Sequence, residues 1–247
     1  MNQRYKLTLE YDGSNFSGWQ KQKNAKTIQA TLIECFQKVL HETGGSFKDL
    51  QGAGRTDTGV HAYAQVAHLD AETDLQPQEL MTAVNHILPP SINILSMQLA
   101  DPRFHARHWA KSRQYVYRIS KRRNAFERKF ICWVKDDLNV STMQTAAASL
   151  IGFADFASFS SKPAKEKSTQ VDLHGIDISE HDDLILVRVK ASHFLWNMVR
   201  NLVGALIEIG KGDMPPERLA EALQSYDAEL CQFRAPAAGL FLEQIEY

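Results

Sequence analysis

The spacing of hydrophobic residues in the first hundred positions constrains the fold more than any other feature of the sequence. Tyrosines and leucines alternate with polar residues over 5–11, which is the two-residue period of a β-strand. Apolar residues then recur with helical spacing from Ile28 to Leu40, between a capping Thr27 and the pair Gly44-Gly45. Strand, strand, helix and strand patterns follow over 47–53, 60–70, 77–88 and 92–100. The order β-α-β-β-α-β predicts a ferredoxin-like unit.

The second part of the chain repeats this order of elements with additions and without a residue-level repeat. Strand patterns cover 114–120, 130–135, 169–179, 183–191 and 240–247, and helical patterns cover 141–152, 194–209 and 215–223. We therefore expect an α+β fold of two ferredoxin-like (RRM-like) β-α-β-β-α-β halves, 1–101 and 102–247. We expect them to form a continuous, mainly antiparallel sheet with helices on one face and a basic cleft between the halves.

Positive charge is concentrated between Arg103 and Lys129. This stretch holds ten of the chain's 28 lysines and arginines, but only one of its 29 acidic residues, Glu127. A run of charge is most often a solvated face. Here five aromatic residues interleave with it, and basic residues mixed with aromatics suit phosphate contacts and base stacking. The segment therefore indicates a nucleic-acid partner, and its candidate contacts are Arg103, Arg107 and Arg113.

Composition excludes several other classes of protein. No apolar run reaches membrane-spanning length, and the N-terminus has no signal-peptide hydrophobic region, so we expect no membrane span and a cytoplasmic location. Cys35, Cys132 and Cys231 are far apart and odd in number, which fits free thiols better than disulfides or zinc. No nucleotide-binding or metalloprotease motif is present, and we expect neither a metal nor a small-molecule cofactor.

One carboxylate, Asp57, stands in the glycine-punctuated stretch GRTDTGVHA, residues 54–62. Aspartate is common in turns for structural reasons, which is the simpler interpretation. Arg200 lies among apolar residues in the helix predicted at 194–209. It can extend to the surface, or it can be buried and need a carboxylate, for which Asp57 is one candidate. An arginine partner would keep Asp57 ionised and competent as a nucleophile.

Tyr115 and Tyr117 share one face of the strand predicted at 114–120. A tyrosine pair in a strand usually packs in a core, whereas its basic surroundings here favour base stacking. The residues alone leave both interpretations open.

Together these motifs resemble the tRNA pseudouridine synthase A family along the whole chain. The resemblance begins at EYDGSNFSGWQKQ and continues through TIQATLIECF, GAGRTDTGVHA, RFHAR, QYVYRI and HFLWNMVRNLVGALIEIG to APAAGLFLEQIEY. The combination of GRTDxGVHA with MVRN is its most specific part.

The resemblance implies a role for four residues. Asp57 would be the catalytic aspartate and Arg200 its ion-pair partner. Tyr115 would stack on the target uracil and is a candidate for the base that removes the C5 proton. Arg55 would help to flip the target base. The reaction implied is the isomerisation of uridine to pseudouridine in the anticodon stem-loop of tRNA, at positions 38, 39 and 40, by a homodimer without a cofactor.

The sequence also departs from the family's usual pattern. Thr58 replaces the alanine that usually follows the catalytic aspartate, and Gln114 and Val116 stand where many members carry basic residues. The alternatives are the same chemistry on ribosomal or other RNA, an RNA-binding paralogue without activity, and a glycoside hydrolase. The last normally needs two carboxylates, and the loop supplies one. Asp57 could attack the ribose, attack the base or remove a ribose proton.

Overall fold

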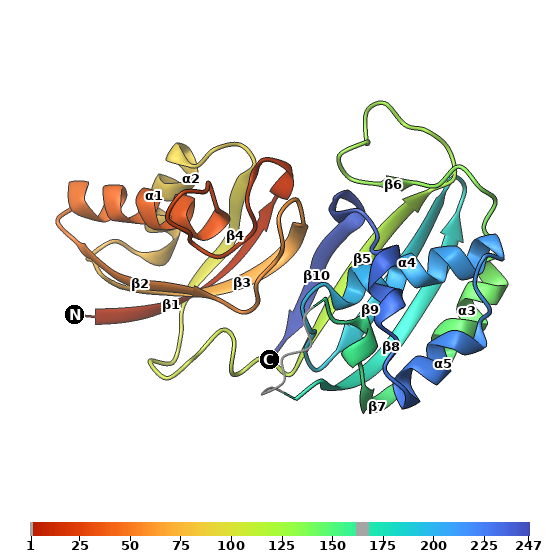
Figure 1. Ribbon diagram of the computed structural model, residues 1–247. Coiled ribbons are helices and arrows are strands. Elements are labelled where there is room, and N and C mark those ends of the chain that lie inside the picture. Colours follow the sequence, from red (N-terminus) through yellow and green to blue (C-terminus); the bar gives the residue numbers. More distant parts are fainter. Residues whose placement is uncertain (1, 162–167) are drawn as a thin grey trace. The chain divides into compact units, whose positions relative to one another are not determined.

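The computed structural model of the chain describes residues 2–161 and 168–247 (Figure 1). Contacts between residues divide it into two compact units. The first contains the chain up to Lys111 together with Leu242–Tyr247, and the second contains Ser112–Phe241. Both units combine strands with helices, which confirms the α+β class.

The first unit has the predicted element order. It consists of β1 (Asn2–Tyr11), α1 (Ile28–Glu42), β2 (Ser46–Gly52), β3 (His61–Glu72), α2 (Pro77–Ile87) and β4 (Ile92–Leu99), with a short 3-10 helix at Gly13–Asn15. Strand β1 pairs antiparallel with β3 and β4, and β2 pairs antiparallel with β3, so the strand order is β4-β1-β3-β2. Figure 1 shows α1 and α2 on one face of these strands.

Local signals in the sequence set the ends of both helices. The Thr27 side chain accepts a hydrogen bond from the Ala30 amide at 3.3 Å, and Gly44 follows α1 with a φ of +76°. Pro77 opens α2 behind a capping box formed by Gln76 and Glu79. The apolar faces of these elements are fully buried and form the core: Tyr5, Leu7 and Leu9 of β1, and Ile28, Leu32, Phe36 and Leu40 of α1.

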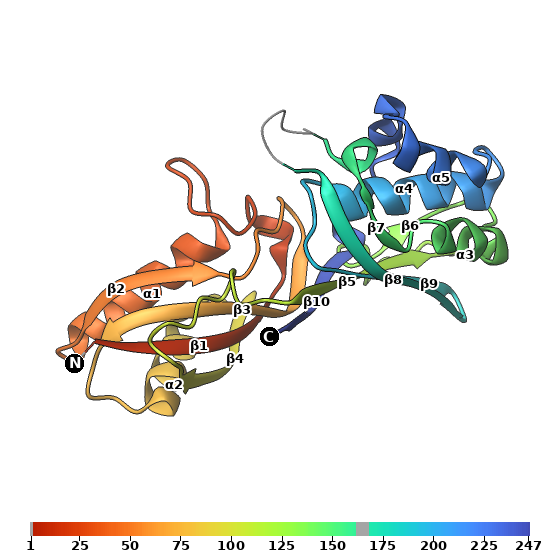
Figure 2. The same ribbon diagram turned by 90° about the horizontal axis from the view of Figure 1, so that it is seen from below.

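The second unit begins with β5 (Ser112–Ser120), which pairs antiparallel with β9 (Leu184–Ala191). The strand order continues from β9 to β8 (Gln170–His181) and β7 (Gly152–Asp155), and the two-residue β6 (Cys132–Trp133) pairs with β5. Its helices α3 (Val140–Ala148), α4 (Met198–Lys211) and α5 (Glu217–Gln224) lie on one face of the strands (Figure 2). Strand β10 (Leu240–Glu246) starts in the second unit and ends in the first.

Three elements differ from the sequence prediction. Helix α4 begins at Met198 rather than at residue 194, because Asn197 has a left-handed backbone with φ 59°. It ends at Lys211, because Gly212 has φ 86°. The strand predicted at 130–135 shrinks to β6, and β7 was not predicted at all.

The compact units do not coincide with the halves expected at 1–101 and 102–247. Residues 102–111 belong to the first unit, where two of their apolar side chains, Phe104 and Ala106, are buried. Phe104 and Ala106 pack with Ala53 and Val66 in one cluster. Arg4 donates a 2.9 Å hydrogen bond to the Phe104 carbonyl. The basic segment is therefore divided between the two units.

None of the helices in the described ranges is long and apolar enough to cross a membrane.

Candidate active site

Asp57 lies in the loop that joins β2 to β3, and it is half-buried. Its backbone carbonyl accepts a 3.1 Å hydrogen bond from the Val60 amide, which closes a turn in which Gly59 has φ 77°. The turn therefore uses the backbone of Asp57.

Thr56 anchors this loop to the core of the first unit. Its buried hydroxyl lies 2.8 Å from the hydroxyl of Tyr11, and its carbonyl accepts a 3.0 Å hydrogen bond from the Trp19 amide. Burial raises the pKa of Tyr11 to about 12, while hydrogen bonds to Thr56 and Gln65 partly oppose that rise. Tyr11 is therefore neutral at ordinary pH, and the residue preceding Asp57 is held by an uncharged network.

The segment between β1 and α1 packs directly on the Asp57 loop. A Cβ at Gly18 would lie 2.5 Å from the Thr56 carbonyl oxygen, and a Cβ at Gly13 would lie 2.0 Å from that of Val60. Only glycine permits backbones to approach this closely. The hydrophobic pattern does not predict this contact, and its signal in the sequence is the pair of glycines in DGSNFSGWQ.

Arg55 is exposed on the same loop, two residues before Asp57. Its Nε donates a 3.0 Å hydrogen bond to the Gln20 side chain, and Gln20 in turn donates to Gln29 on α1 at 2.6 Å. The first unit therefore carries Arg55 and Asp57 on one loop, and hydrogen bonds from Arg55 and Thr56 attach this loop to neighbouring segments.

The two tyrosines of β5 have different environments. Tyr117 is fully buried, its hydroxyl donates a 2.8 Å hydrogen bond to the Pro236 carbonyl, and burial raises its pKa well above the usual range. The core-packing interpretation therefore applies to Tyr117. Tyr115 is 7% exposed, and its ring meets Phe194 edge to face, with centroids 5.1 Å apart.

Arg200 lies in the first turn of α4 and is half-buried. Its Nε donates to the Ala235 carbonyl at 2.8 Å, and its Nη1 lies 3.4 Å from the side-chain oxygen of Asn197. The Arg200 carbonyl accepts a 3.0 Å hydrogen bond from the Ala235 amide. These contacts hold the guanidinium in place, so Arg200 does not simply extend into solvent.

The remaining predicted contacts differ in their surroundings. Arg103 is exposed and pairs with Asp101 at 3.2 Å, and Arg107 is exposed as well. Arg113 is half-buried and donates a 3.0 Å hydrogen bond to the Ser192 carbonyl, so it also supports the fold. Of the five aromatic residues of the basic segment, Phe104, Tyr115 and Tyr117 are buried, whereas Trp109 and Phe126 are exposed.

The predicted residues are thus distributed over both units. Asp57, Arg55, Arg103 and Arg107 belong to the first, and Tyr115, Arg113 and Arg200 belong to the second. Within the described ranges, no group of three or more histidine, cysteine, aspartate or glutamate side chains could hold a metal ion.

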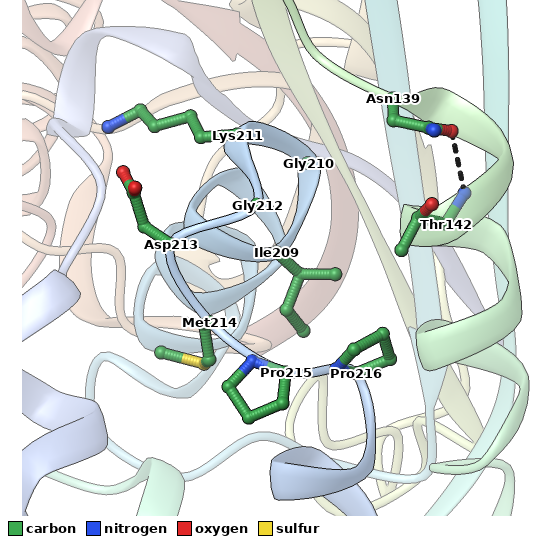
Figure 3. Close-up of a pocket in the computed structure, with 10 residues that line it drawn as sticks. All are labelled: Asn139, Thr142, Ile209, Gly210, Lys211, Gly212, Asp213, Met214, Pro215 and Pro216. Atoms are coloured by element: carbon green, nitrogen blue, oxygen red, sulfur yellow. Dashed lines mark hydrogen bonds between the residues drawn. The ribbon is translucent and has the colours of Figure 1, made fainter.

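A pocket of about 500 Å³ lies elsewhere, at the C-terminal end of α4 (Figure 3). Residues 209–216 line it together with Asn139 and Thr142 of the α3 N-terminus, where the Asn139 side chain caps the helix through the Thr142 amide at 3.0 Å. None of the predicted site residues lines this pocket, and we assign it no role.

Comparison with known proteins identifies the family of the chain. The family model described as tRNA pseudouridine synthase matches residues 8–108 and 146–247. The chain is 37% identical to tRNA pseudouridine synthase A 2 of Bacillus anthracis, over 98% of this chain and 99% of that one. It is 39% identical to tRNA pseudouridine synthase A of Nitrosococcus oceani, over 99% of this chain and 93% of that one.

These matches cover nearly the whole chain and place it in one class of enzyme. The chain belongs to the tRNA pseudouridine synthase family. It is a pseudouridine synthase, and the reaction class is that of an isomerase.

Proposed function

We propose that this chain converts uridine to pseudouridine in the anticodon stem-loop of tRNA, with Asp57 as the catalytic nucleophile. The observation that carries the proposal is the immobilised Asp57 loop. The hydroxyl of buried Thr56 anchors the loop to Tyr11 in the core, and the backbone at Gly18 packs against the Thr56 carbonyl. A carboxylate carried on a backbone fixed in this way has less freedom to lose when it reacts, which is the contribution of positioning to catalysis.

The reaction breaks the bond between ribose C1′ and uracil N1, turns the uracil and joins its C5 atom to C1′. The C5 proton is released to solvent and N1 takes up a proton. There is no net oxidation or reduction, so a carboxylate nucleophile and groups that accept and return a proton suffice. The target base must first leave its stack, which costs a few kcal/mol. Stacking on the Tyr115 ring offsets part of that cost, and Arg55 assists in displacing the base.

In this proposal Arg200 is the ion-pair partner of Asp57. Its support is the fixed position of the guanidinium, which Ala235 and Asn197 hold within the second unit. The planar guanidinium of arginine can bind a carboxylate through two parallel hydrogen bonds. A positioned arginine therefore favours the ionised form of the nucleophile.

The proposal also includes a tRNA-bound homodimer in the cytoplasm, as the family resemblance implies. All three cysteines, Cys35, Cys132 and Cys231, are free thiols, which fits a reducing compartment.

Replacing Asp57 by asparagine tests the proposal. Asp57→Asn keeps the size of the side chain but removes the nucleophile, so we expect turnover to be lost while RNA affinity changes little. Release of tritium from C5-labelled tRNA measures turnover, and RNA binding is measured in parallel. Asp74→Asn, at an exposed position of the same unit, is the matched control and should behave as the parent. Near-parental turnover by Asp57→Asn would refute the assignment.

A further inference from the structure

The loop 121–131 joins β5 to β6 (Figure 1). It exposes one aromatic ring, that of Phe126, to solvent. Phe126 is 95% exposed, whereas the next most exposed large apolar side chain in the described ranges, Phe153, is 73% exposed. A phenylalanine stabilises a fold by burying its ring away from water. Phe126 contributes almost nothing of this kind to the fold.

The backbone around Phe126 forms a defined turn. The Asn124 side chain accepts hydrogen bonds from the amides of Phe126 and Glu127, at 3.0 and 3.2 Å. The Phe130 amide donates to the Glu127 carbonyl at 2.7 Å, and the Glu127 carboxylate pairs with Arg118 of β5 at 3.3 Å. An aspartate- or asparagine-type turn of this kind gives the loop a preferred shape. Phe126 is therefore presented by local structure.

Basic residues flank Phe126 along the chain. At the start of the loop, Lys121 pairs with Glu180 at 2.6 Å and Arg122 pairs with Asp183 at 2.5 Å, which fixes the loop to the β8–β9 hairpin. The other three basic residues of the loop are exposed and lie within three positions of the ring: Arg123, Arg128 and Lys129.

We propose that this loop is an RNA-docking surface separate from the residues that act on the target uridine. Phe126 stacks on an unpaired base, and Arg123, Arg128 and Lys129 contact the flanking phosphates. Stacking on an aromatic ring combined with phosphate contacts is how proteins bind single-stranded nucleic acid. The proposal rests on the proposed function in one respect, namely that the substrate is a structured RNA.

The position of the loop on β5 determines which part of the RNA it contacts. A strand rises about 3.3 Å per residue, so Ser120 at the end of β5 lies about 17 Å along the strand from Tyr115. Stacked nucleotides rise about 3.4 Å each, so this separation spans about five of them. The base that stacks on Phe126 is therefore a different nucleotide from the one at Tyr115.

The charges around Phe126 favour RNA over a protein partner. A stable protein interface buries about 800 Å² on each partner, and its core is depleted of charged residues. Here one exposed ring lies on a loop with three exposed cations within three positions of it in the sequence, which complements a polyanion instead.

Replacing the ring tests the proposal. Phe126→Ala should weaken binding of a tRNA transcript about 5- to 100-fold and raise KM similarly, because a base loses its stacking partner. The rate kcat at saturating tRNA should stay at the parental value, and Phe126→Trp should restore binding. Phe153→Ala removes an exposed ring from β7 of the same unit and is the matched control. It should bind tRNA as the parent does.

Replacing the cations tests the phosphate contacts. The triple variant Arg123→Gln, Arg128→Gln, Lys129→Gln should reduce the slope of log Kd against log salt by about 2–3. Unchanged tRNA affinity in Phe126→Ala, or an equal loss in Phe153→Ala, would overturn the proposal. The proposal would also be overturned if Phe126→Ala changed the sedimentation of the protein without changing its affinity for tRNA, because the loop would then contact another protein chain. These binding measurements do not depend on turnover, so they remain separate from a failure of the proposed reaction.

Discussion

At the scale of single residues, the candidate site depends on buried neighbours as much as on its charged groups. Thr56, which directly precedes Asp57, forms a hydrogen bond with Tyr11, and neither residue carries charge at ordinary pH. Asp57, Tyr115 and Arg200 could be singled out from the sequence, because each is chemically conspicuous among its neighbours. Tyr11 could not be, because its alternation with apolar residues in β1 indicates only a core position.

His68 gives a residue-scale prediction about pH. Its buried ring accepts a 3.2 Å hydrogen bond from the Ala106 amide at Nδ1, which requires the neutral form. Burial, followed by the charges of Arg4 and His105, lowers its pKa from 6.5 to about 4, although Asp70 and Asp49 oppose this. The unfolded chain therefore takes up a proton near pH 6.5 that the folded chain resists until about pH 4. The stability contributed by neutral His68 is full above pH 6.5 and is lost as pH falls towards 4.

The substitution His68→Asn isolates this effect, because an amide oxygen can accept the Ala106 hydrogen bond without titrating in this range. Between pH 7 and pH 4 the parent should lose about 2–3 kcal/mol more of its free energy of unfolding than the variant does. Urea unfolding at a series of pH values measures both. Parallel pH profiles for the two proteins would contradict the assignment of the shift to His68.

At the scale of elements, the β2–β3 loop and the segment between β1 and α1 are joined by backbone hydrogen bonds. The Gly59 amide donates to the Phe16 carbonyl at 3.3 Å, and the Trp19 amide donates to the Thr56 carbonyl at 3.0 Å. The hydrophobic pattern predicted the strands and helices on either side of these segments. It could not predict that the segments touch, because such a contact is made by backbone groups.

Gly18 and Gly44 provide a matched pair of substitutions. Both have positive φ, 84° and 76°, so alanine at either position costs about 1–2 kcal/mol of backbone strain. A Cβ at Gly44 meets nothing within 4 Å, whereas a Cβ at Gly18 collides with the Thr56 carbonyl. Gly18→Ala should therefore displace the Asp57 loop and lower turnover about 100-fold or more, because misplacement by about 1 Å has that effect.

Thermal unfolding measures the stability of the two variants, and tritium release from C5-labelled tRNA measures their turnover. Gly44→Ala should lose stability only and keep parental turnover when fully folded. If Gly18→Ala retains the same turnover as Gly44→Ala, the loop does not need the contact with Gly18.

The start of helix α4 could not be predicted from the hydrophobic pattern of the sequence. The stretch Phe194–Trp196 is as apolar as the helix that follows, so hydrophobic spacing extends the helix to residue 194. The left-handed backbone of Asn197 ends that continuity, and asparagine is one of the few residues that adopts this conformation readily. The same turn places the Asn197 side chain 3.4 Å from Arg200.

At the scale of the whole molecule, the chain builds its first unit from both of its ends. The Lys111 amide donates to the Glu246 carbonyl at 2.8 Å, and the Nζ atom of Lys6 lies 4.3 Å from the centre of the Tyr247 ring. The sequence predicted two parts, but it placed the boundary where the charge changes. Burial of Phe104 and Ala106 keeps residues 102–111 with the first unit instead. Apolar burial thus decided the boundary, and charge did not.

The measurement that tests the central claim most directly uses unmodified tRNA transcripts labelled with tritium at uracil C5. The parent protein alone, without any cofactor, should release tritium, because forming the new carbon–carbon bond expels the C5 hydrogen. Chemical labelling of pseudouridine followed by primer extension should then locate the product in the anticodon stem-loop. Binding of the transcript without release of tritium would contradict the account, and the same assay on ribosomal RNA would show whether another RNA is the substrate.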